Sequence, residues 1–149
     1  MFKHILLPTD GTAATRRAVR KGIRLARVLG ARVTGIYVAP PYPLIYAADG
    51  MAAAAQPPPT QYRRDVQETA KKYLGRVAEV ARKAGVPCAT LCVTNDRPYT
   101  AIMKKTARSK KCDLIVMRAS SRKPLSLRLF ESETRKVLGR SNIPLLILH

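Results

Sequence analysis

Short apolar runs alternate along the chain with longer segments in which apolar residues recur every three or four positions. The runs predict strands, and the longer segments predict amphipathic helices between them. Such an order is typical of a parallel sheet covered by helices on both faces. The pattern predicts an α/β fold, a single doubly wound domain with a five-stranded parallel sheet over residues 1–149. The expected strands are 2–8, 32–38, 87–94, 113–117 and 144–148, and the expected helices are 13–29, 62–84, a segment after 95, and about 132–140.

The first expected helix has the clearest boundaries. Thr12 is a suitable N-cap, and Gly30 stands just past the last apolar position, where glycine commonly ends a helix. One side of this helix is apolar and is expected to face the sheet, and the opposite side is basic. The apolar positions are Ala18, Gly22, Leu25, Ala26 and Leu29, and the basic ones are Arg16, Arg20, Arg24 and Arg27.

Residues 39–61 interrupt this regular order. Six of the eleven prolines lie in this segment, which is also rich in alanine. Proline removes a backbone donor and fixes φ, so no helix or strand should run through it unbroken. We expect a flexible connector here, with a lid over a ligand site as the alternative.

Composition narrows the class of protein. Three cysteines in 149 residues do not make a disulfide framework, and no apolar stretch approaches the about 20 residues of a membrane span. The first residues show no secretory cleavage pattern, so we expect a cytoplasmic protein. The chain has 28 Lys+Arg against 9 Asp+Glu, a net charge of +19 that favours nonspecific affinity for polyanions.

Topology indicates where a ligand would bind. In doubly wound sheets, ligands bind beyond the carboxyl ends of the strands, where the strand order reverses. If the first and fourth strands are neighbours, the site is bounded by the loop at Pro8, Thr9 and Asp10 and by the loop that starts at Met117. The end of the second strand, near Val38, is next to them.

These segments resemble those of a known family. ILLPTDGT, a helix, GARVTGIYV, CDLIVM, SETRKVL and a terminal apolar strand follow one another as in the universal stress protein family. The resemblance covers almost the whole chain apart from the proline-rich segment. It implies a Rossmann-like fold and a nucleotide site, in which Asp10, Val38 and Met117 match positions that contact the nucleoside part of ATP.

Many members of that family hold ATP through a loop G-x-x-G-x9-G-[ST] after the fourth strand. Glycines let backbone N–H groups approach the phosphates. The matching positions in this chain are Arg118, Ser121, Glu131 and Ser132, so all three glycines are replaced and only the serine remains. We therefore expect no bound cofactor, with ATP or another adenine nucleotide as the alternative.

The charges of this loop include groups that would repel a bound anion and groups that would attract it. Glu131 puts a carboxylate where phosphates would lie, and two unit charges 4 Å apart repel by about 4 kcal/mol at an effective dielectric constant near 20. The cationic loop of Arg118, Arg122, Lys123 and Arg128 could attract an anion without a glycine cradle. We expect some of these cations to pair with Glu131, Glu133 or Asp10, with retained anion binding as the alternative.

Other chemistry has little support. His4 and His149 are the only histidines, and Cys88, Cys92 and Cys112 do not have the spacing of a zinc site. We expect His4 at a strand edge or partly exposed, and the thiols buried and reduced. No nucleophile is singled out beside Asp10, so we expect a binding module and not an enzyme.

Two partners remain as expectations. The cations are spread over several helices, and Tyr42, Tyr46 and Tyr62 either stack on bases or pack onto the sheet, so a basic nucleic-acid-associated protein is a second alternative. Residues 144–148, PLLIL, form an apolar edge strand. Family members commonly dimerise through this strand, and the resemblance implies a homodimer.

Overall fold

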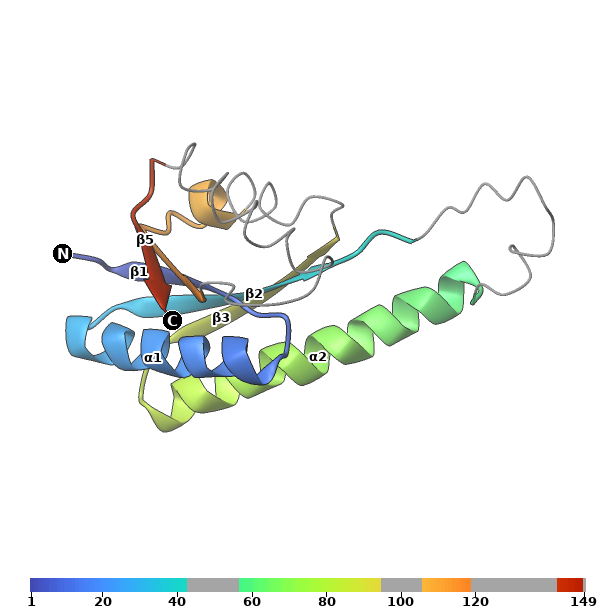
Figure 1. Ribbon diagram of the computed structural model, residues 1–149, viewed down its shortest axis with the longest axis horizontal. Coiled ribbons are helices and arrows are strands. Elements are labelled where there is room, and N and C mark those ends of the chain that lie inside the picture. The colour runs from blue at the N-terminus through green and yellow to red at the C-terminus, as the bar shows by residue number, and fades with distance from the viewer. Residues whose placement is uncertain (43–56, 95–105, 119–141, 149) are drawn as a thin grey trace.

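The computed structural model describes residues 1–42, 57–94, 106–118 and 142–148. Its five strands are all parallel and form one sheet in the order β3-β2-β1-β4-β5 (Figure 1). β1 is thus the central strand, and β3 and β5 are the edges. The strands are β1 His4–Pro8, β2 Arg32–Ala39, β3 Cys88–Thr94, β4 Leu114–Arg118 and β5 Leu145–Leu148.

Two helices, α1 Ala13–Leu29 and α2 Pro59–Lys83, cover one face of the sheet (Figure 1). Thr12 caps α1, since its hydroxyl accepts a hydrogen bond from the N–H of Thr15 at 3.2 Å. Gly30 ends α1 in the left-handed region with φ 62°. Both predicted boundaries of this helix are confirmed.

Alternation along the strands builds two cores. In β1, Ile5 and Leu7 join the core beneath α1 and α2, whereas Leu6 between them joins the core on the other face. Ala107, in the helical residues 106–109, packs into that second core. Helices therefore contribute to both faces, and the predicted α/β class with a five-stranded parallel sheet is confirmed.

Some boundaries differ from the expected ones. Ala39 still belongs to β2, and α2 begins at Pro59, so the expected loop 39–61 is too long at both ends. Proline suits the first turn of a helix because the N–H that it lacks would have no partner there. The buried face of α1 also includes Val19 and Ile23, which the expected apolar face omitted.

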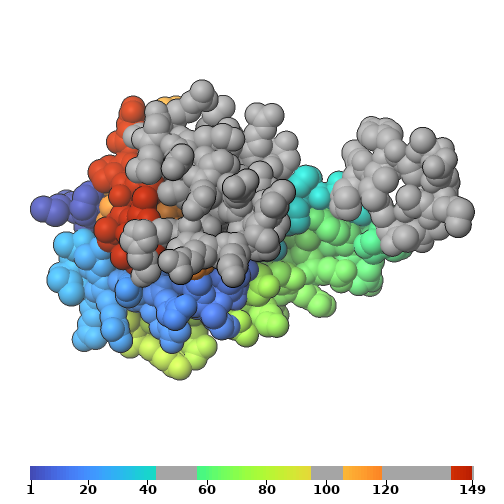
Figure 2. Space-filling view, in the orientation of Figure 1, coloured from blue at the N-terminus to red at the C-terminus, as the bar shows by residue number. Residues whose placement is uncertain are grey.

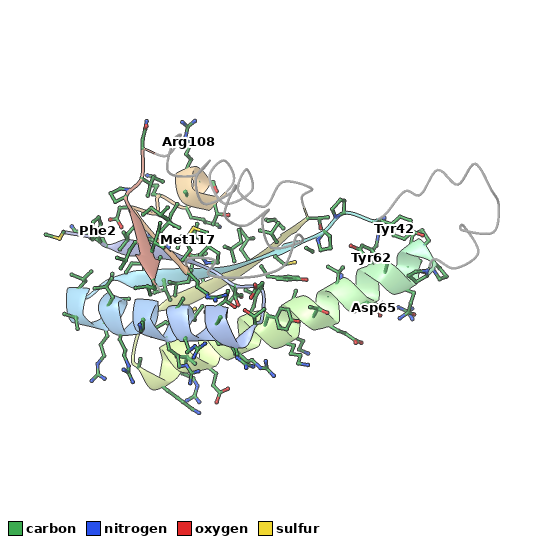
Figure 3. The ribbon with its side chains drawn as sticks, viewed as in Figure 1. Phe2, Tyr42, Tyr62, Asp65, Arg108 and Met117 are labelled. Carbon is green, nitrogen blue, oxygen red and sulfur yellow. The ribbon has the colours of Figure 1, made fainter. Side chains whose placement is uncertain are left out.

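The ends of that proline-rich segment are joined by two tyrosines. The rings of Tyr42 and Tyr62 meet edge to face with centroids 5.2 Å apart (Figure 3). The Tyr62 hydroxyl donates to the Pro40 carbonyl at 2.6 Å, and the Tyr42 hydroxyl donates to the Pro57 carbonyl at 2.9 Å. These two rings thus pack on each other and not on the sheet. Tyr46 lies outside the described residues.

The expected exposure of His4 is wrong. His4 is only 6 % exposed because β1 is the central strand, and its Nε2 lies 2.8 Å from the Thr34 hydroxyl on β2. The expectation of buried thiols holds for Cys112, whereas Cys88 is half-buried and Cys92 is exposed on the edge strand β3. Within the described ranges, no helix has the length and apolar character needed to cross a bilayer.

Candidate functional site

The candidate site lies where the strand order reverses. β1 pairs with β2 on one side and with β4 on the other, and all strands are parallel. The connections after β1 and β4 therefore both leave the sheet at the edge formed by the carboxyl ends of the strands. Pro8 pairs with Ile36, and Met117 and Arg118 end β4 at this edge. The condition on which the site prediction depended, adjacent first and fourth strands, is met.

The loop after β1 is held by its own hydrogen bonds. The N–H of Thr9 donates to the Ile36 carbonyl at 2.9 Å, which fixes the loop to β2. The N–H of Gly11 donates to the Thr9 hydroxyl at 3.2 Å, and Gly11 has φ 76°. Because side chains disfavour this φ, glycine suits the turn from β1 into α1.

Asp10 has a structural role in this turn. Its carboxylate accepts a hydrogen bond from the N–H of Thr12 at 2.9 Å and another from the Thr15 hydroxyl. The expected ion pair between Asp10 and the cationic loop does not form with Arg118, the loop member inside the described residues, because the two are not within ion-pair distance. Thr15 is therefore a partner that sequence reasoning missed, although its place in the first turn of α1 was a usable signal.

The remaining predicted site residues are only partly described. Val38 lies two residues beyond Ile36 in β2, so it projects past the end of β1 at the same edge as Pro8, Thr9, Asp10, Met117 and Arg118. Ser121, Arg122, Glu131 and Ser132 lie outside the described residues. So does the expected helix 132–140 and most of the helix expected after 95.

Tyr73 of α2 is a second neighbour that the sequence did not reveal. Its ring lies against Gly11: a Cβ at Gly11 would come within 2.3 Å of the Tyr73 ring carbons. The same ring meets Tyr37 of β2 edge to face, with centroids 5.4 Å apart. No local pattern links residues 11 and 73, because the contact depends on how α2 crosses the sheet.

The cysteines and the buried histidine are poorly suited to nucleophilic chemistry at this site. Desolvation raises the pKa of the half-buried Cys88 and of Cys92, which is only partly covered on β3, and burial together with the Asp113 charge raises the pKa of Cys112 to about 11. His4 stands at the opposite end of β1, about 13 Å from Pro8 at the rise of a strand. Across the described part of the chain, no three His, Cys, Asp or Glu side chains are grouped to hold a metal ion.

Comparison with known proteins gives the class to which this fold and site belong. The model of the universal stress protein family matches residues 1–149, so the chain belongs to the universal stress protein family. A universal stress protein of Methanocaldococcus jannaschii is 27% identical over 149 residues, which are 99% of this chain and 82% of that protein.

Solved structures of the family share the fold. A universal stress protein in complex with cAMP has a TM-score of 0.69 at 19% identity, covering 99% of this chain and 97% of that one. The universal stress protein from Archaeoglobus fulgidus in complex with dAMP has a TM-score of 0.67 at 16% identity, covering 100% of this chain and 98% of that one.

Proposed function

We propose that this universal stress protein is a non-catalytic binding module of the stress response whose loop after β4 does not hold the triphosphate of ATP. The proposal rests on the loss of the glycines from this loop. Residues Arg118, Ser121 and Glu131 replace the three glycines of the family loop, and no glycine occurs between Gly85 and Gly139. Side chains at these positions keep phosphates from the backbone N–H groups.

Electrostatics supports the same conclusion. In the sequence, Glu131 and Glu133 flank Ser132, which matches the family position that binds phosphate, and carboxylates there would repel a triphosphate. Acidic residues at the start of a helix also stabilise its dipole, which gives them a structural role without a ligand. The carboxylate of Asp10, for its part, is already bonded to Thr12 and Thr15.

We propose that the protein is not an enzyme, on the basis of the protonation of its three thiols and the position of His4. The three thiols have raised pKa values, so few are thiolates at neutral pH. The histidine at position 4 is buried against Thr34, away from the loop after β1. Neither kind of side chain is placed to activate a nucleophile beside Asp10.

Calorimetry on nucleotide-free protein tests the loss of ATP binding. We expect Mg-ATP to give no measurable heat. Glu131→Gly should increase ATP affinity by about tenfold or more, because half of a 4 kcal/mol repulsion corresponds to roughly thirtyfold in affinity. Glu133→Gln removes the neighbouring acid but restores no glycine, so it should give a smaller gain in ATP affinity and separates the effect of charge from that of the glycine. Micromolar binding of Mg-ATP to the unaltered protein would refute the proposal.

A second candidate is binding of an adenine mononucleotide. Two relatives of the same fold are solved with cAMP and with dAMP, each of which carries a single phosphate. The positions matched to nucleoside contacts, Asp10, Val38 and Met117, lie together at the edge of the sheet. Calorimetry with AMP and cAMP separates this candidate from the first, because a mononucleotide should bind where ATP does not.

We also propose a homodimer through β5. This strand is an edge of the sheet, paired with β4 on one side only, and Leu146 on it is 37% exposed. An apolar edge strand offers unpaired backbone groups and apolar side chains to a second copy.

A further inference from the structure

Thirteen of the nineteen basic residues that the structure describes lie on two helices, α1 and α2. α1 and α2 lie side by side on the same face of the sheet, and their outer surfaces adjoin (Figure 2). Together they carry thirteen basic and three acidic side chains, a net charge of +10 out of the +19 of the chain. Figure 3 shows the nitrogen-tipped side chains of these helices pointing away from the sheet.

A groove runs between the two helices. It has a volume of about 410 Å³ and extends from the loop after β1 along the first half of α1. Three exposed arginines line it: Arg16 and Arg20, one turn apart on α1, and Arg76 on α2. The half-buried ring of Tyr73 lies at its end near Gly11.

The positive charge of the groove is not neutralised within the described part of the chain. Glu79 is the acidic residue that lines it, and the Glu79 carboxylate pairs with Lys83 at 2.7 Å. The Lys83 side-chain hydrogen bond holds the pKa of Glu79 below its usual value, so the acid stays ionised within its own pair. None of the three arginines forms an ion pair with a described acid.

We propose that this groove binds the sugar-phosphate backbone of a nucleic acid. It adjoins the nucleotide positions beyond the strand ends and shares Thr9 with them, but its three arginines are not among those positions. The four arginines Arg16, Arg20, Arg24 and Arg27 continue the positive line along α1 over about 16 Å at 1.5 Å per residue. One strand of a duplex carries about five phosphates over that length.

The chemistry favours a nucleic-acid backbone over other anions. Guanidinium groups match phosphate oxygens in a two-pronged geometry, which makes arginine well suited to nucleic-acid backbones. A row of cations spaced along a helix suits a polymer with regularly spaced charges, and backbone contacts carry no sequence information. We therefore expect binding that depends on salt and not on base sequence.

The test is fluorescence anisotropy of a labelled DNA duplex from about 50 to 200 mM salt. The groove variant R16Q/R20Q/R76Q should bind at least tenfold more weakly than the unaltered protein at low salt. The slope of log affinity against log salt should become shallower by about two to three, because about 0.9 is lost per phosphate contact. A second duplex of unrelated sequence should bind equally.

The control removes three exposed cations elsewhere, in K3Q/R108Q/K110Q. Arg108 projects on the other side of the sheet from α1 and α2 (Figure 3). This variant has the same net charge as the groove variant and should lose less than about threefold in affinity, with a slope change below one. Thermal unfolding shows whether both variants stay folded; exposed substitutions usually change stability within about 0.5 kcal/mol.

Three results would overturn the proposal. Equal losses in both variants would mean diffuse attraction by net charge. No duplex binding at low salt would exclude the partner altogether. Vesicles of phosphatidylserine that lose binding with the groove variant, while the duplex is unaffected, would identify a lipid surface as the occupant. The calorimetric result with ATP is independent of all three, because the two sites share no arginine.

Discussion

His4 is a buried base at the start of the central strand. Its Nε2 lies 2.8 Å from the Thr34 hydroxyl, and its Nδ1 has no hydrogen-bond partner among the described residues. Burial lowers the pKa of His4 below 6.5, and the charges of Arg32 and Lys110 lower it further, against the opposing effects of the Lys110 backbone and the Asp113 charge. His4 is therefore neutral in the folded protein over a pH range in which the unfolded chain takes up a proton.

This difference predicts a loss of stability on mild acidification. As the pH falls below 6.5, the unfolded state binds a proton at His4 that the folded state resists, so the free energy of unfolding decreases. The slope attributable to one group reaches at most about 1.4 kcal/mol per pH unit. Urea unfolding between about pH 5 and pH 8 measures it, since an unperturbed histidine titrates in this range.

Two variants test whether His4 causes the pH dependence of the free energy of unfolding. His4→Gln should flatten the dependence below pH 6.5, whatever its effect on stability at neutral pH. His149→Gln removes the other histidine and should leave the slope of the unaltered protein in place. If His4→Gln keeps the full slope, burial of His4 is not its source.

The burial of His4 is a residue-level feature that could not be predicted from the sequence. Histidine in an apolar strand has no local sign of burial, and the Thr34 contact spans thirty residues. By contrast, Thr12 and Gly30 were predictable because capping depends on neighbours within four positions.

At the scale of the element, the turn from β1 into α1 depends on Gly11. Its φ of 76° and the Tyr73 ring against it leave no room for a side chain. Gly75 in α2 is the opposite case, because a Cβ there would meet nothing within 4 Å. The two glycines differ both in backbone conformation and in what surrounds them.

Alanine at these positions should therefore have opposite effects. Gly11→Ala should lower the free energy of unfolding by at least about 1 kcal/mol, from strain at positive φ and displacement of Tyr73. Gly75→Ala should raise it by about 0.5–1 kcal/mol, because alanine has the higher helix propensity. Chemical denaturation measures both, and a neutral Gly11→Ala would contradict the close approach of α2.

The elements themselves were predictable, and their contacts were not. Apolar runs and helical spacing identify strands and helices from their own residues, so β1 to β5, α1 and α2 came within a few residues of their bounds. The pairing of Tyr73 with Gly11, and of Tyr42 with Tyr62, depends on the path of α2 over the sheet. The location of the site could be predicted, because it follows from the strand order. The hydrogen bond between Asp10 and Thr15 could not be predicted.

At the scale of the whole molecule, the described sheet has two edge strands, β3 and β5. β5 lies at one edge and exposes Leu146, while Val28, which is 83% exposed, belongs to α1 and not to an edge strand. The proposed dimer depends on Leu146 and does not depend on Val28. A high positive charge opposes association, so the apolar contact has to supply the attraction.

A charge at Leu146 should disrupt the dimer. Leu146→Glu is expected to shift the protein from dimer to monomer in light scattering coupled to size exclusion, because a carboxylate would be buried between two apolar edges. Val28→Glu introduces the same charge at a site outside the interface and should remain dimeric. A monomeric unaltered protein, or a dimeric Leu146→Glu, would rule out this interface.

The central place of β1 also has a consequence for synthesis. β1 is made first, and β2 covers one of its edges soon afterwards, but the other edge waits for β4, more than a hundred residues later. Until Leu114 and Ile115 emerge, the backbone of Ile5 and Leu6 is unpaired on that side. The nascent chain therefore passes through a long interval in which this buried strand can adhere to a neighbouring polypeptide, and chaperone protection matters most during that interval.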